Sequence, residues 1–456
     1  MSCLPDSLLS RWAEVLEKKA DRPALFDASG SVLKTFAEIE RESGGWQEKL
    51  AGFPTRAVIG IQLGNHPAWP SVLLAIWRNG QIALPLDASL RSELTTQILQ
   101  TAGASALLVE SEIFPCEFES NVSFSTETSL FKVTSGTTGT PRLIAFTLAQ
   151  ILADSDNICA TMGLLESDVN YGAVPLSHSY GFSNLLTPLL TCGLPLVIAR
   201  DNLPQAMFAG LAATRATVLA GIPVLYQSLA RLQLTLPETV RLCLTAGAPL
   251  SSELAVEFHR QNGRKIHSFY GASECGGICY DASEEVDLPP GFVGQPMNGV
   301  ELECKNDRIT VRSAAVGLGY IPSAENDALQ NGSFHPSDLV ELTSHGYRIT
   351  GRISDFINIT GKKLDPQIVE SIIEKIPGVS RAIVCGIPHE RRGELVIAIV
   401  ETNHVAAEEV LAVCRHLLAP WQVPSDVWLL EQIPVTERGK FNRRELAESY
   451  LTRLKS

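Results

Sequence analysis

The sequence predicts an α/β fold in which a large N-terminal part of parallel α/β layers, with a small β subdomain, precedes a small C-terminal α/β domain. Apolar strand-like runs alternate with helical patterns up to about Gly291. Short alternating runs separated by Gly, Asn and Ser then continue to about Ser354, after which helices and strands alternate again. The 456 residues, 45% of them hydrophobic, are enough to bury a substantial core.

The first expected elements are an amphipathic helix and, after it, a strand–helix–strand unit. An amphipathic helix is expected over residues 6–20. Strands at 57–63 and 81–86 then flank a helix around 67–77, the arrangement that places two strands parallel in one sheet. The same alternation of strands and helices recurs at 92–110, 201–222, 223–247 and 252–271.

The later elements are shorter. The β subdomain is expected to contain strands at 300–304, 308–313 and 347–352. The C-terminal domain spans roughly a hundred residues, the size of an independent folding unit. It is expected to contain helices at 366–376 and 407–418 and strands at 381–388, 394–402 and 426–434.

Charge and cysteine content narrow the class of protein. The net charge of -13 and the pI near 5.3 argue against a nucleic-acid-binding surface. The ten cysteines show no CxxC spacing, so we expect reduced thiols, mostly in the core, and interpret Cys275 and Cys279 as buried rather than metal-bound. The N-terminus lacks an export-signal pattern, and the most apolar stretch, 185–199, is too short to span a bilayer. A cytoplasmic enzyme without a transmembrane segment is favoured.

One segment, TSGTTGTPR at 134–142, lies between two strand-like runs and concentrates hydroxyl groups, two glycines and an arginine. Exposed backbone N–H groups with hydroxyls and a cation nearby form a concavity that binds anions such as polyphosphate. The pattern GxxxxGK[ST] of kinase-type phosphate loops is not matched. A phosphate loop of another kind is therefore predicted, and a surface hairpin without a ligand is the alternative.

Seven motifs, in this order, resemble those of the adenylate-forming superfamily, which contains acyl-CoA synthetases, nonribosomal-peptide adenylation domains and luciferases. They are TSGTTGTPR (134–142), PLSHSYG (175–181), TAGAPL (245–250), YGASE (270–274), SDL (337–339), GRISDFINITGKKLDPQIVE (351–370) and PVTERGKFNRREL (434–446). The chain is most similar to the acyl- and aryl-CoA ligase branch. The resemblance implies an N-terminal domain over 1–353 with the nucleotide and acyl sites, and a mobile C-terminal lid over 354–456.

The resemblance also implies a reaction. A carboxylic acid and ATP, with Mg²⁺, give an acyl-adenylate and pyrophosphate, and the acyl group then passes to the phosphopantetheine thiol of CoA or of an acyl carrier protein. The expected partners are a small-molecule carboxylic acid and one of these two acceptors, with no nucleic acid, and a homodimer stays an open alternative.

Phosphate-binding roles follow from the matched positions. Arg142 stands where the superfamily more often has lysine, and its forked guanidinium suits phosphate. Glu274 matches the Mg²⁺ ligand, and Ser273, in place of a threonine, keeps a hydroxyl for the α-phosphate. The β- and γ-phosphates are expected on Thr134, Ser135, Gly136, Thr137, Thr138 and Gly139.

Nucleoside-binding roles fall on other motifs. Asp338 matches the aspartate that accepts hydrogen bonds from the ribose hydroxyls, although HPSD replaces the usual TGD around it. Arg352 matches an arginine that contacts ribose and phosphate. The adenine slot is expected to be formed by Gly247, Ala248, Pro249, Tyr270 and Gly271.

The C-terminal domain supplies three further positions. Lys440 matches the catalytic lysine, which would bridge the attacking carboxylate and the α-phosphate and stabilise charge in the transition state. Ser354 matches the hinge at which the lid pivots. Gly361 matches the glycine that lets the pantetheine arm pass close to the backbone, which a side chain would prevent.

The acyl pocket is expected beside His178 and Tyr180. SHSYGFSNLL carries no acidic residue to pair with an α-ammonium group, and the next acid along the chain is Asp201. An acyl, aryl or fatty acid is therefore favoured over an amino acid. The alternatives are a stand-alone amino-acid adenylation enzyme and a non-catalytic relative that binds nucleotide or acyl ligand.

Overall fold

The structure is a computed structural model that describes residues 7–118, 123–135, 141–200, 203–323, 327–330, 332–352, 357–359, 362–389, 393–434, 441 and 443–455. The chain forms two compact units. The N-terminal unit comprises Met1–Pro336 and Glu341–Arg348, and the C-terminal unit comprises Ser337–Val340 and Ile349–Ser456. The boundary predicted at residue 354 lies outside the described residues and stays a prediction.

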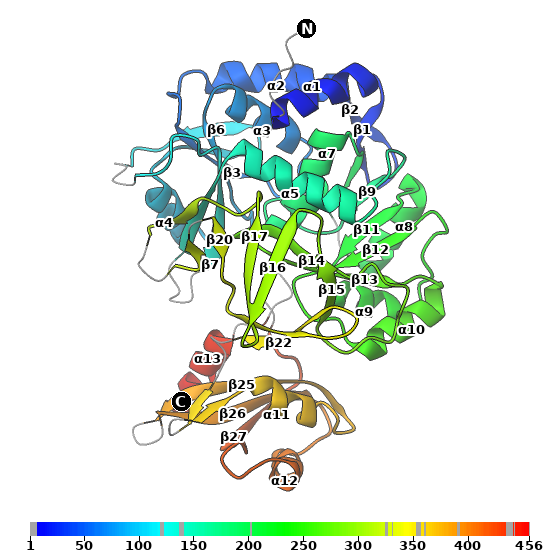
Figure 1. Ribbon diagram of the computed structural model, residues 1–456, viewed down its shortest axis with the longest axis vertical. Helices are drawn as coiled ribbons and strands as arrows, with labels where there is room; N and C mark the ends of the chain where they lie inside the picture. The colour runs from blue at the N-terminus through cyan, green and yellow to red at the C-terminus, as the bar shows by residue number, and fades with distance from the viewer. Residues whose placement is uncertain are drawn as a thin grey trace. The chain divides into compact units, whose positions relative to one another are not determined.

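A largely parallel sheet forms one half of the N-terminal unit (Figure 1). Strands β13, β12, β11, β9, β10 and β1 lie in this order, and each neighbouring pair is parallel. Strand β2 extends one edge antiparallel to β1, and β14 and β15 extend the other. The bounds are β1 (Pro23–Asp27), β2 (Val32–Thr35), β9 (Asn170–Gly172), β10 (Leu196–Ile198), β11 (Val218–Gly221), β12 (Leu242–Thr245), β13 (Ile266–Ala272), β14 (Gly276–Tyr280) and β15 (Phe292–Pro296).

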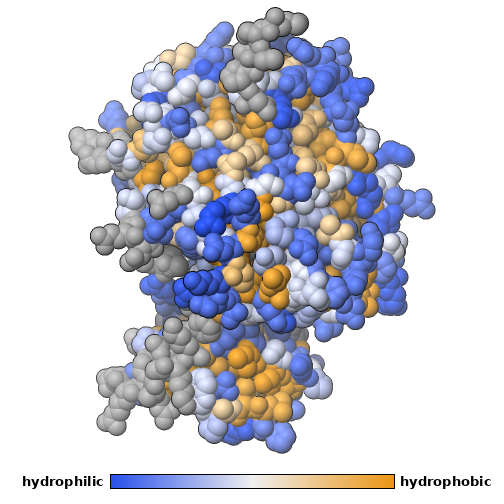
Figure 2. All heavy atoms as spheres, viewed as in Figure 1, coloured by the Kyte–Doolittle hydropathy of each residue, from blue (hydrophilic) through white to orange (hydrophobic). Residues whose placement is uncertain are grey.

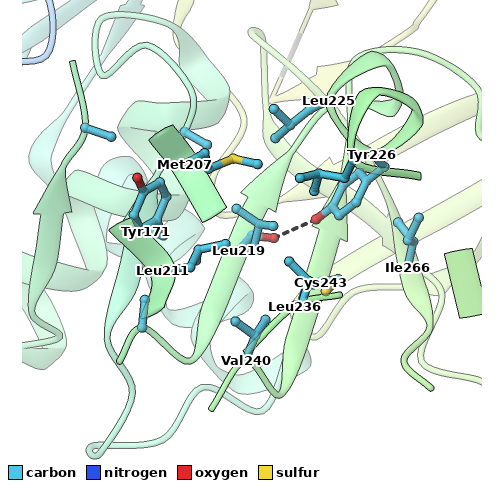
Figure 3. Packing of buried hydrophobic residues seen from close by; sticks show 14 of the residues in the cluster. Tyr171, Met207, Leu211, Leu219, Leu225, Tyr226, Leu236, Val240, Cys243 and Ile266 are labelled. Atoms are coloured by element: carbon cyan, nitrogen blue, oxygen red, sulfur yellow. Dashed lines mark hydrogen bonds between the residues drawn. The ribbon is translucent and has the colours of Figure 1, made fainter. Parts of the chain in front are cut away.

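Three helices cover this sheet: α8 (Pro204–Thr214), α9 (Pro223–Arg231) and α10 (Ser252–Asn262). Proline occupies the first position of α8 and of α9, where its missing N–H costs no helical hydrogen bond. Side chains of these helices meet strand side chains in a buried cluster that includes Met207, Tyr226 and Cys243 (Figure 3). The Tyr226 hydroxyl donates to the Leu219 carbonyl at 2.8 Å, so the ring is buried while the hydroxyl keeps a hydrogen-bond partner.

A second sheet has the strand order β18-β8-β7-β4-β3-β5-β6. Its centre, β7-β4-β3-β5, is parallel, and the remaining pairs are antiparallel. The predicted first unit is present as β3, α3 and β4. The bounds are β3 (Val58–Gln62), β4 (Ile82–Pro85), β5 (Ala104–Val109), β6 (Glu112–Pro115), β7 (Leu130–Ser135), β8 (Pro141–Phe146), β18 (Gly319–Ile321), α2 (Phe36–Leu50), α3 (Trp69–Arg78) and α4 (Ser92–Ala102).

A group of helices packs together beside these sheets, with α1 and α5 both in contact with α7. Thr147 caps α5 by accepting a hydrogen bond from the Gln150 amide at 3.1 Å, and the Gln150 side chain accepts one from the Thr147 amide at 2.8 Å. The apolar stretch 185–199, expected only as core, turns from helix into strand after Gly193, whose φ of +63° ends α7. The helices are α1 (Leu8–Lys19), α5 (Leu148–Thr161), α6 (Ser179–Gly181), η1 (Phe182–Leu186) and α7 (Thr187–Cys192).

The expected β subdomain is present as short antiparallel strands, with β17 paired to both β16 and β20. Their bounds are β16 (Val300–Lys305), β17 (Arg308–Ser313), β19 (Leu329–Gln330), β20 (Ser333–Phe334), β21 (Asp338–Leu342) and β22 (Tyr347–Arg352).

The C-terminal unit is built on a mixed sheet in which β25 and β26 are antiparallel and β26 and β27 are parallel. Alternate residues of β25 enter two hydrophobic clusters, one with Val384 and one with Cys385, so both faces of the sheet are covered. The C-terminal helix α13 was not predicted. The bounds are β23 (Ile357–Ile359), β24 (Lys362–Leu364), α11 (Pro366–Ile373), β25 (Val379–His389), β26 (Gly393–Thr402), α12 (Ala407–Leu417), β27 (Asp426–Leu430) and α13 (Arg443–Lys455).

The outer surface is mixed in character, and Figure 2 shows hydrophilic and hydrophobic residues interspersed over the face that it presents. None of the helices in the described ranges has the length and apolar character needed to cross a membrane.

Candidate active site

Three of the sequence motifs follow strands of the parallel sheet. PLSHSYG comes after β9, TAGAPL begins at the end of β12, and YGASE begins at the end of β13. Because β9, β11, β12 and β13 are parallel, their carboxyl ends share one edge of the sheet, where open α/β sheets bind ligands. One contact joins two motifs there, since Ser179 Oγ donates to Ser273 Oγ at 2.9 Å. The Tyr180 hydroxyl donates at 3.4 Å to the carbonyl of Leu244, the residue before TAGAPL.

The predicted magnesium ligand, Glu274, lies in the turn between β13 and β14. Its carboxylate accepts a hydrogen bond from the Tyr320 hydroxyl at 2.8 Å, and its backbone carbonyl accepts one from the Gly317 amide at 2.8 Å. Burial, followed by the neighbouring Glu274 charge, raises the pKa of Tyr320, so this hydroxyl stays protonated and donates. Sequence reasoning missed Tyr320, because a single tyrosine in a short strand carries no signal of this contact.

The hairpin β7–β8 carries the predicted phosphate loop. Its strands pair with Thr134 opposite Arg142, and Gly136, Thr137, Thr138 and Gly139 lie outside the described residues. The Arg142 guanidinium forms an ion pair with Asp327 at 2.8 Å and donates to the Pro322 carbonyl at 2.6 and 3.2 Å. It also lies 4.3 Å from the centre of the Tyr320 ring, so Tyr320 contacts both Arg142 and Glu274.

A buried polar network lies behind the hairpin. Lys132, on β7, donates to Ser183 Oγ at 3.4 Å, and Ser183 donates to Asp154 on α5 at 2.6 Å. Burial lowers the pKa of Lys132, and the Asp154 charge raises it. Sequence reasoning missed this network too, although a lysine between Phe131 and Val133 in an apolar strand is a usable signal.

Asp154 also reaches the turn that holds Glu274, because its carboxylate accepts a hydrogen bond from the Gly277 amide at 3.0 Å. The approach is so close that a side-chain carbon at Gly276 would lie 2.0 Å from Asp154 Oδ1. Gly276 also has a φ of +70°, which a residue with a side chain rarely adopts. The network therefore joins the phosphate-loop hairpin, helix α5 and the Glu274 turn.

His178 forms a hydrogen bond with the Asp87 carboxylate, which comes from the loop after β4 in the other sheet. Burial would raise the pKa of Asp87, but hydrogen bonds from His178 and Ser89 outweigh it and lower the pKa. Sequence reasoning missed Asp87, because it lies 91 residues from His178 and no local pattern links the two. The ring of Tyr180 lies 5.8 Å from that of Phe269, and burial raises the pKa of Tyr180.

The residues predicted to bind adenine lie on the same strand ends. Tyr270 is buried on β13, and Gly247 follows β12 with a φ of +85°. Ala248 and Pro249 are exposed, as a ligand-facing turn requires. A side-chain carbon at Gly271 would lie 2.8 Å from the Gly276 carbonyl, so glycine is needed there.

The remaining predicted residues belong to the C-terminal unit. Asp338 is buried at the start of β21. Arg352 ends β22, and nothing of its side chain is described. Lys440, Ser354 and Gly361 lie outside the described residues. The described residues contain no cluster of three or more His, Cys, Asp or Glu that could hold a metal by itself.

Two family models match the chain, and together they span more than half of it. Residues 125–321 match the AMP-binding enzyme model, and residues 368–440 match the model of the AMP-binding enzyme C-terminal domain. The chain belongs to the AMP-binding enzyme family. The family predicted from the seven motifs is thereby confirmed.

Curated relatives of this AMP-binding enzyme include CoA ligases. The oxalate–CoA ligase of Arabidopsis thaliana is 25% identical, over 98% of this chain and 99% of the relative. The 2-succinylbenzoate–CoA ligase of Geobacillus kaustophilus is 26% identical, over 92% of this chain and 94% of the relative.

Solved structures confirm the fold class of the AMP-binding enzyme. ATP-bound MatB from Rhodopseudomonas palustris superposes with a TM-score of 0.83 at 22% identity, covering 98% of this chain and 99% of that one. O-succinylbenzoate CoA synthetase from Bacillus subtilis, in complex with AMP, gives a TM-score of 0.82 at 23% identity, covering 96% and 97%. The predicted fold class, a large N-terminal α/β part with a smaller C-terminal sheet domain, is confirmed.

Proposed function

We propose that the protein is an AMP-forming acid–thiol ligase, which activates a carboxylic acid with ATP as an acyl-adenylate and then transfers the acyl group to CoA. The observation that carries this proposal is the shared sheet edge, where the motif after β9 and the motif that ends at Glu274 meet through the Ser179–Ser273 hydrogen bond. The predicted enzyme class is confirmed by the family and by the named relatives.

In the first half-reaction, a carboxylate oxygen of the acid attacks the α-phosphorus of ATP, and pyrophosphate leaves. Glu274 fits a magnesium site, because Mg²⁺ is usually bound by one or two carboxylates together with the phosphates of the substrate. The ion, when bound, neutralises charge on the phosphate oxygens. Tyr320 holds one oxygen of Glu274 by its hydrogen bond and orients the carboxylate.

The loop 134–139 would surround the β- and γ-phosphates with backbone N–H groups and hydroxyls. Arg142 is already bound by Asp327 and the Pro322 carbonyl, so its charge would act on phosphate while these contacts brace the hairpin. Asp338 and Arg352 would bind the ribose, and Lys440 would approach the attacking carboxylate and the α-phosphate.

In the second half-reaction, the thiol sulfur attacks the carbonyl carbon of the acyl-adenylate, the thiol proton is lost, and AMP leaves. Gly361 would line the path of the pantetheine arm, and Ser354 would be the hinge about which the lid turns. CoA is preferred over a carrier protein because the relatives are named CoA ligases. The reaction belongs in the cytoplasm, where ATP and CoA are supplied.

The substrate is proposed to lack an α-amino group. The acid found beside His178, Asp87, is engaged by that histidine and by Ser89, whose backbone amide and hydroxyl both donate to it. These bonds leave Asp87 poorly placed to pair with an ammonium group. An acyl, aryl or fatty acid fits better.

A pyrophosphate-exchange assay over a panel of fatty, aromatic and dicarboxylic acids and the twenty amino acids tests this proposal. We expect exchange with a member of the first three classes, and formation of its CoA thioester when CoA is added. Gly361→Trp should keep exchange and lose thioester formation. An amino acid as the best substrate would refute the substrate class, and no exchange with any acid would support a non-catalytic relative instead.

A further inference from the structure

A pair of thiols lies on two helices, outside the site motifs. Cys159 is in the last turn of α5, and Cys192 is the last residue of α7. Their sulfur atoms are 3.5 Å apart, although 33 residues separate them in the sequence. Both side chains are half-buried, so the expectation that the cysteines are mostly core thiols does not describe this pair.

Both cysteines line a surface cavity of about 270 Å³. The basic residues Arg11, Lys18 and Lys19 of α1 lie on its wall together with Glu14 and Glu166, and Arg11 is paired with Asp156. Small disulfides such as oxidised glutathione carry carboxylates, which basic side chains attract. The thiols therefore border a surface cavity whose wall carries charges of both signs, with Lys18 and Lys19 available to the carboxylates of such a reagent.

From this geometry we propose that Cys159 and Cys192 form a redox-active dithiol, which a low-molecular-weight disulfide oxidises to an intramolecular disulfide. The sulfur atoms must approach by about 1.5 Å to reach the length of an S–S bond. The cavity at their side and the end of α7 at Gly193 leave room for this movement.

The order of attack follows from the opposite pKa shifts of the two thiols. The side-chain interaction between the two thiols lowers the pKa of Cys192 and raises the pKa of Cys159. The Cys192 thiolate attacks one sulfur of oxidised glutathione and releases one glutathione thiolate. Cys159 then loses its proton and attacks the Cys192 sulfur of the mixed disulfide, releasing the second glutathione. Two protein thiols are oxidised, and one disulfide is reduced to two thiols.

The cross-link would join two elements that lead to the active site. Helix α5 continues from β8 of the phosphate-loop hairpin, and α7 continues from the segment that carries His178 and Tyr180. Lys19 already fixes the end of α7 by donating to the Cys192 and Gly193 carbonyls at 3.1 and 3.2 Å. A disulfide closing this loop also restricts the unfolded chain, so the oxidised protein should have a higher Tm.

The test uses the full-length protein, equilibrated in buffers of increasing ratio of oxidised to reduced glutathione, then alkylated, digested and analysed by mass spectrometry. We expect a peptide pair joined through Cys159 and Cys192, increasing with the ratio and disappearing on addition of dithiothreitol. Cys159→Ser should instead leave Cys192 as a mixed disulfide with glutathione. Cys116→Ser, a half-buried cysteine elsewhere, is the matched control and should keep the cross-link.

Two results would overturn the proposal. One is that both thiols stay alkylatable at every ratio, while glutathione modifies other cysteines of the same sample. The other is that Cys159 or Cys192 forms its disulfide with a different cysteine. Both readouts come from the wild-type protein and are independent of ligase activity.

Discussion

The two units hold their chemistry-bearing residues by different means. In the N-terminal unit, polar side chains from distant segments contact one another, as Tyr320 does with Glu274 and Lys132 does with Ser183. In the C-terminal unit, two hydrophobic clusters cover the faces of one sheet, and an ion pair between the buried Glu370 and the partly exposed Arg443 ties α11 to α13.

This difference matches two tasks in an adenylating enzyme. Groups that stabilise charge must be placed before the reaction, and polar contacts in a buried setting place them accurately. A lid needs a stable platform for the segments that it presents. Arg443 begins α13, three positions after Lys440 in the sequence, and its pair with Glu370 fixes the start of this helix.

The largest expected effect comes from breaking the buried network in the N-terminal unit. Asp154→Ala leaves the Lys132 ammonium buried without its counter-charge, which should cost about 3 to 5 kcal/mol of unfolding free energy. Urea unfolding measures the loss. The matched control is the double variant Lys132→Met with Asp154→Leu, which should recover most of it. A double variant as unstable as the single one would refute the ionic role.

Lys440→Ala tests the charge that the C-terminal unit is proposed to bring to the reaction. Removing one preorganised charge donor should slow adenylation at least about a hundredfold, or about 3 kcal/mol in activation free energy. Thioester formation from preformed acyl-adenylate should be reduced much less. Pre-steady-state kinetics measures the rate of each half-reaction separately. Equal losses of rate in both would contradict the role assigned to Lys440.

Arg443→Met probes the platform of the C-terminal unit. Its partner Glu370 is buried and accepts two hydrogen bonds from Arg443, at 2.7 and 2.8 Å, as well as one from the Val384 amide. Because Arg443 is partly exposed, the expected loss of unfolding free energy is about 2 kcal/mol. Arg444→Met, which breaks the exposed pair with Glu448, is the matched control and should change stability little. Similar losses in both variants would contradict the anchoring role.

Tyr320→Phe removes one hydrogen bond to Glu274 and keeps the aromatic ring beside Arg142. A hydrogen bond to a charged group contributes about 1.5 kcal/mol or more, so kcat/KM for adenylation should fall roughly tenfold. The Mg²⁺ concentration needed for half-maximal rate should rise as well. An unchanged Mg²⁺ dependence would show that Tyr320 does not orient the proposed magnesium ligand.

At Asp87 the expected effect is a dependence of stability on pH. Its pKa is lowered in the folded protein from the ordinary 3.8, so its contribution to stability is present above pH 3.8 and is lost as the pH falls towards the folded value. Asp87→Asn should therefore lower the Tm by the same amount at neutral and mildly acidic pH, with the difference shrinking only below pH 3.8. A difference that disappears between pH 7 and 5 would indicate that another group is responsible.

The sequence alone determined the fold class, the family and the order of the strands and helices around the motifs. Those inferences depend on patterns within short segments, such as the alternation at 57–86 or the run TSGTTGTPR. The convergence of PLSHSYG, TAGAPL and YGASE at one edge follows once the strands before them are parallel. The C-terminal helix α13 was not predicted, because its sequence is polar over most of its length and shows no clear apolar face.

Only the tertiary structure decided which side chains support the site. Tyr320 lies 46 residues from Glu274 in the chain, Asp87 lies 91 residues from His178, and Cys159 lies 33 residues from Cys192. Each contact forms between segments that are distant in the sequence, so neither the periodicity nor the residue spacing within one segment indicates it. The packing of two sheets and a helical layer brings these groups within hydrogen-bonding distance, and most polar groups buried in a protein find such a partner.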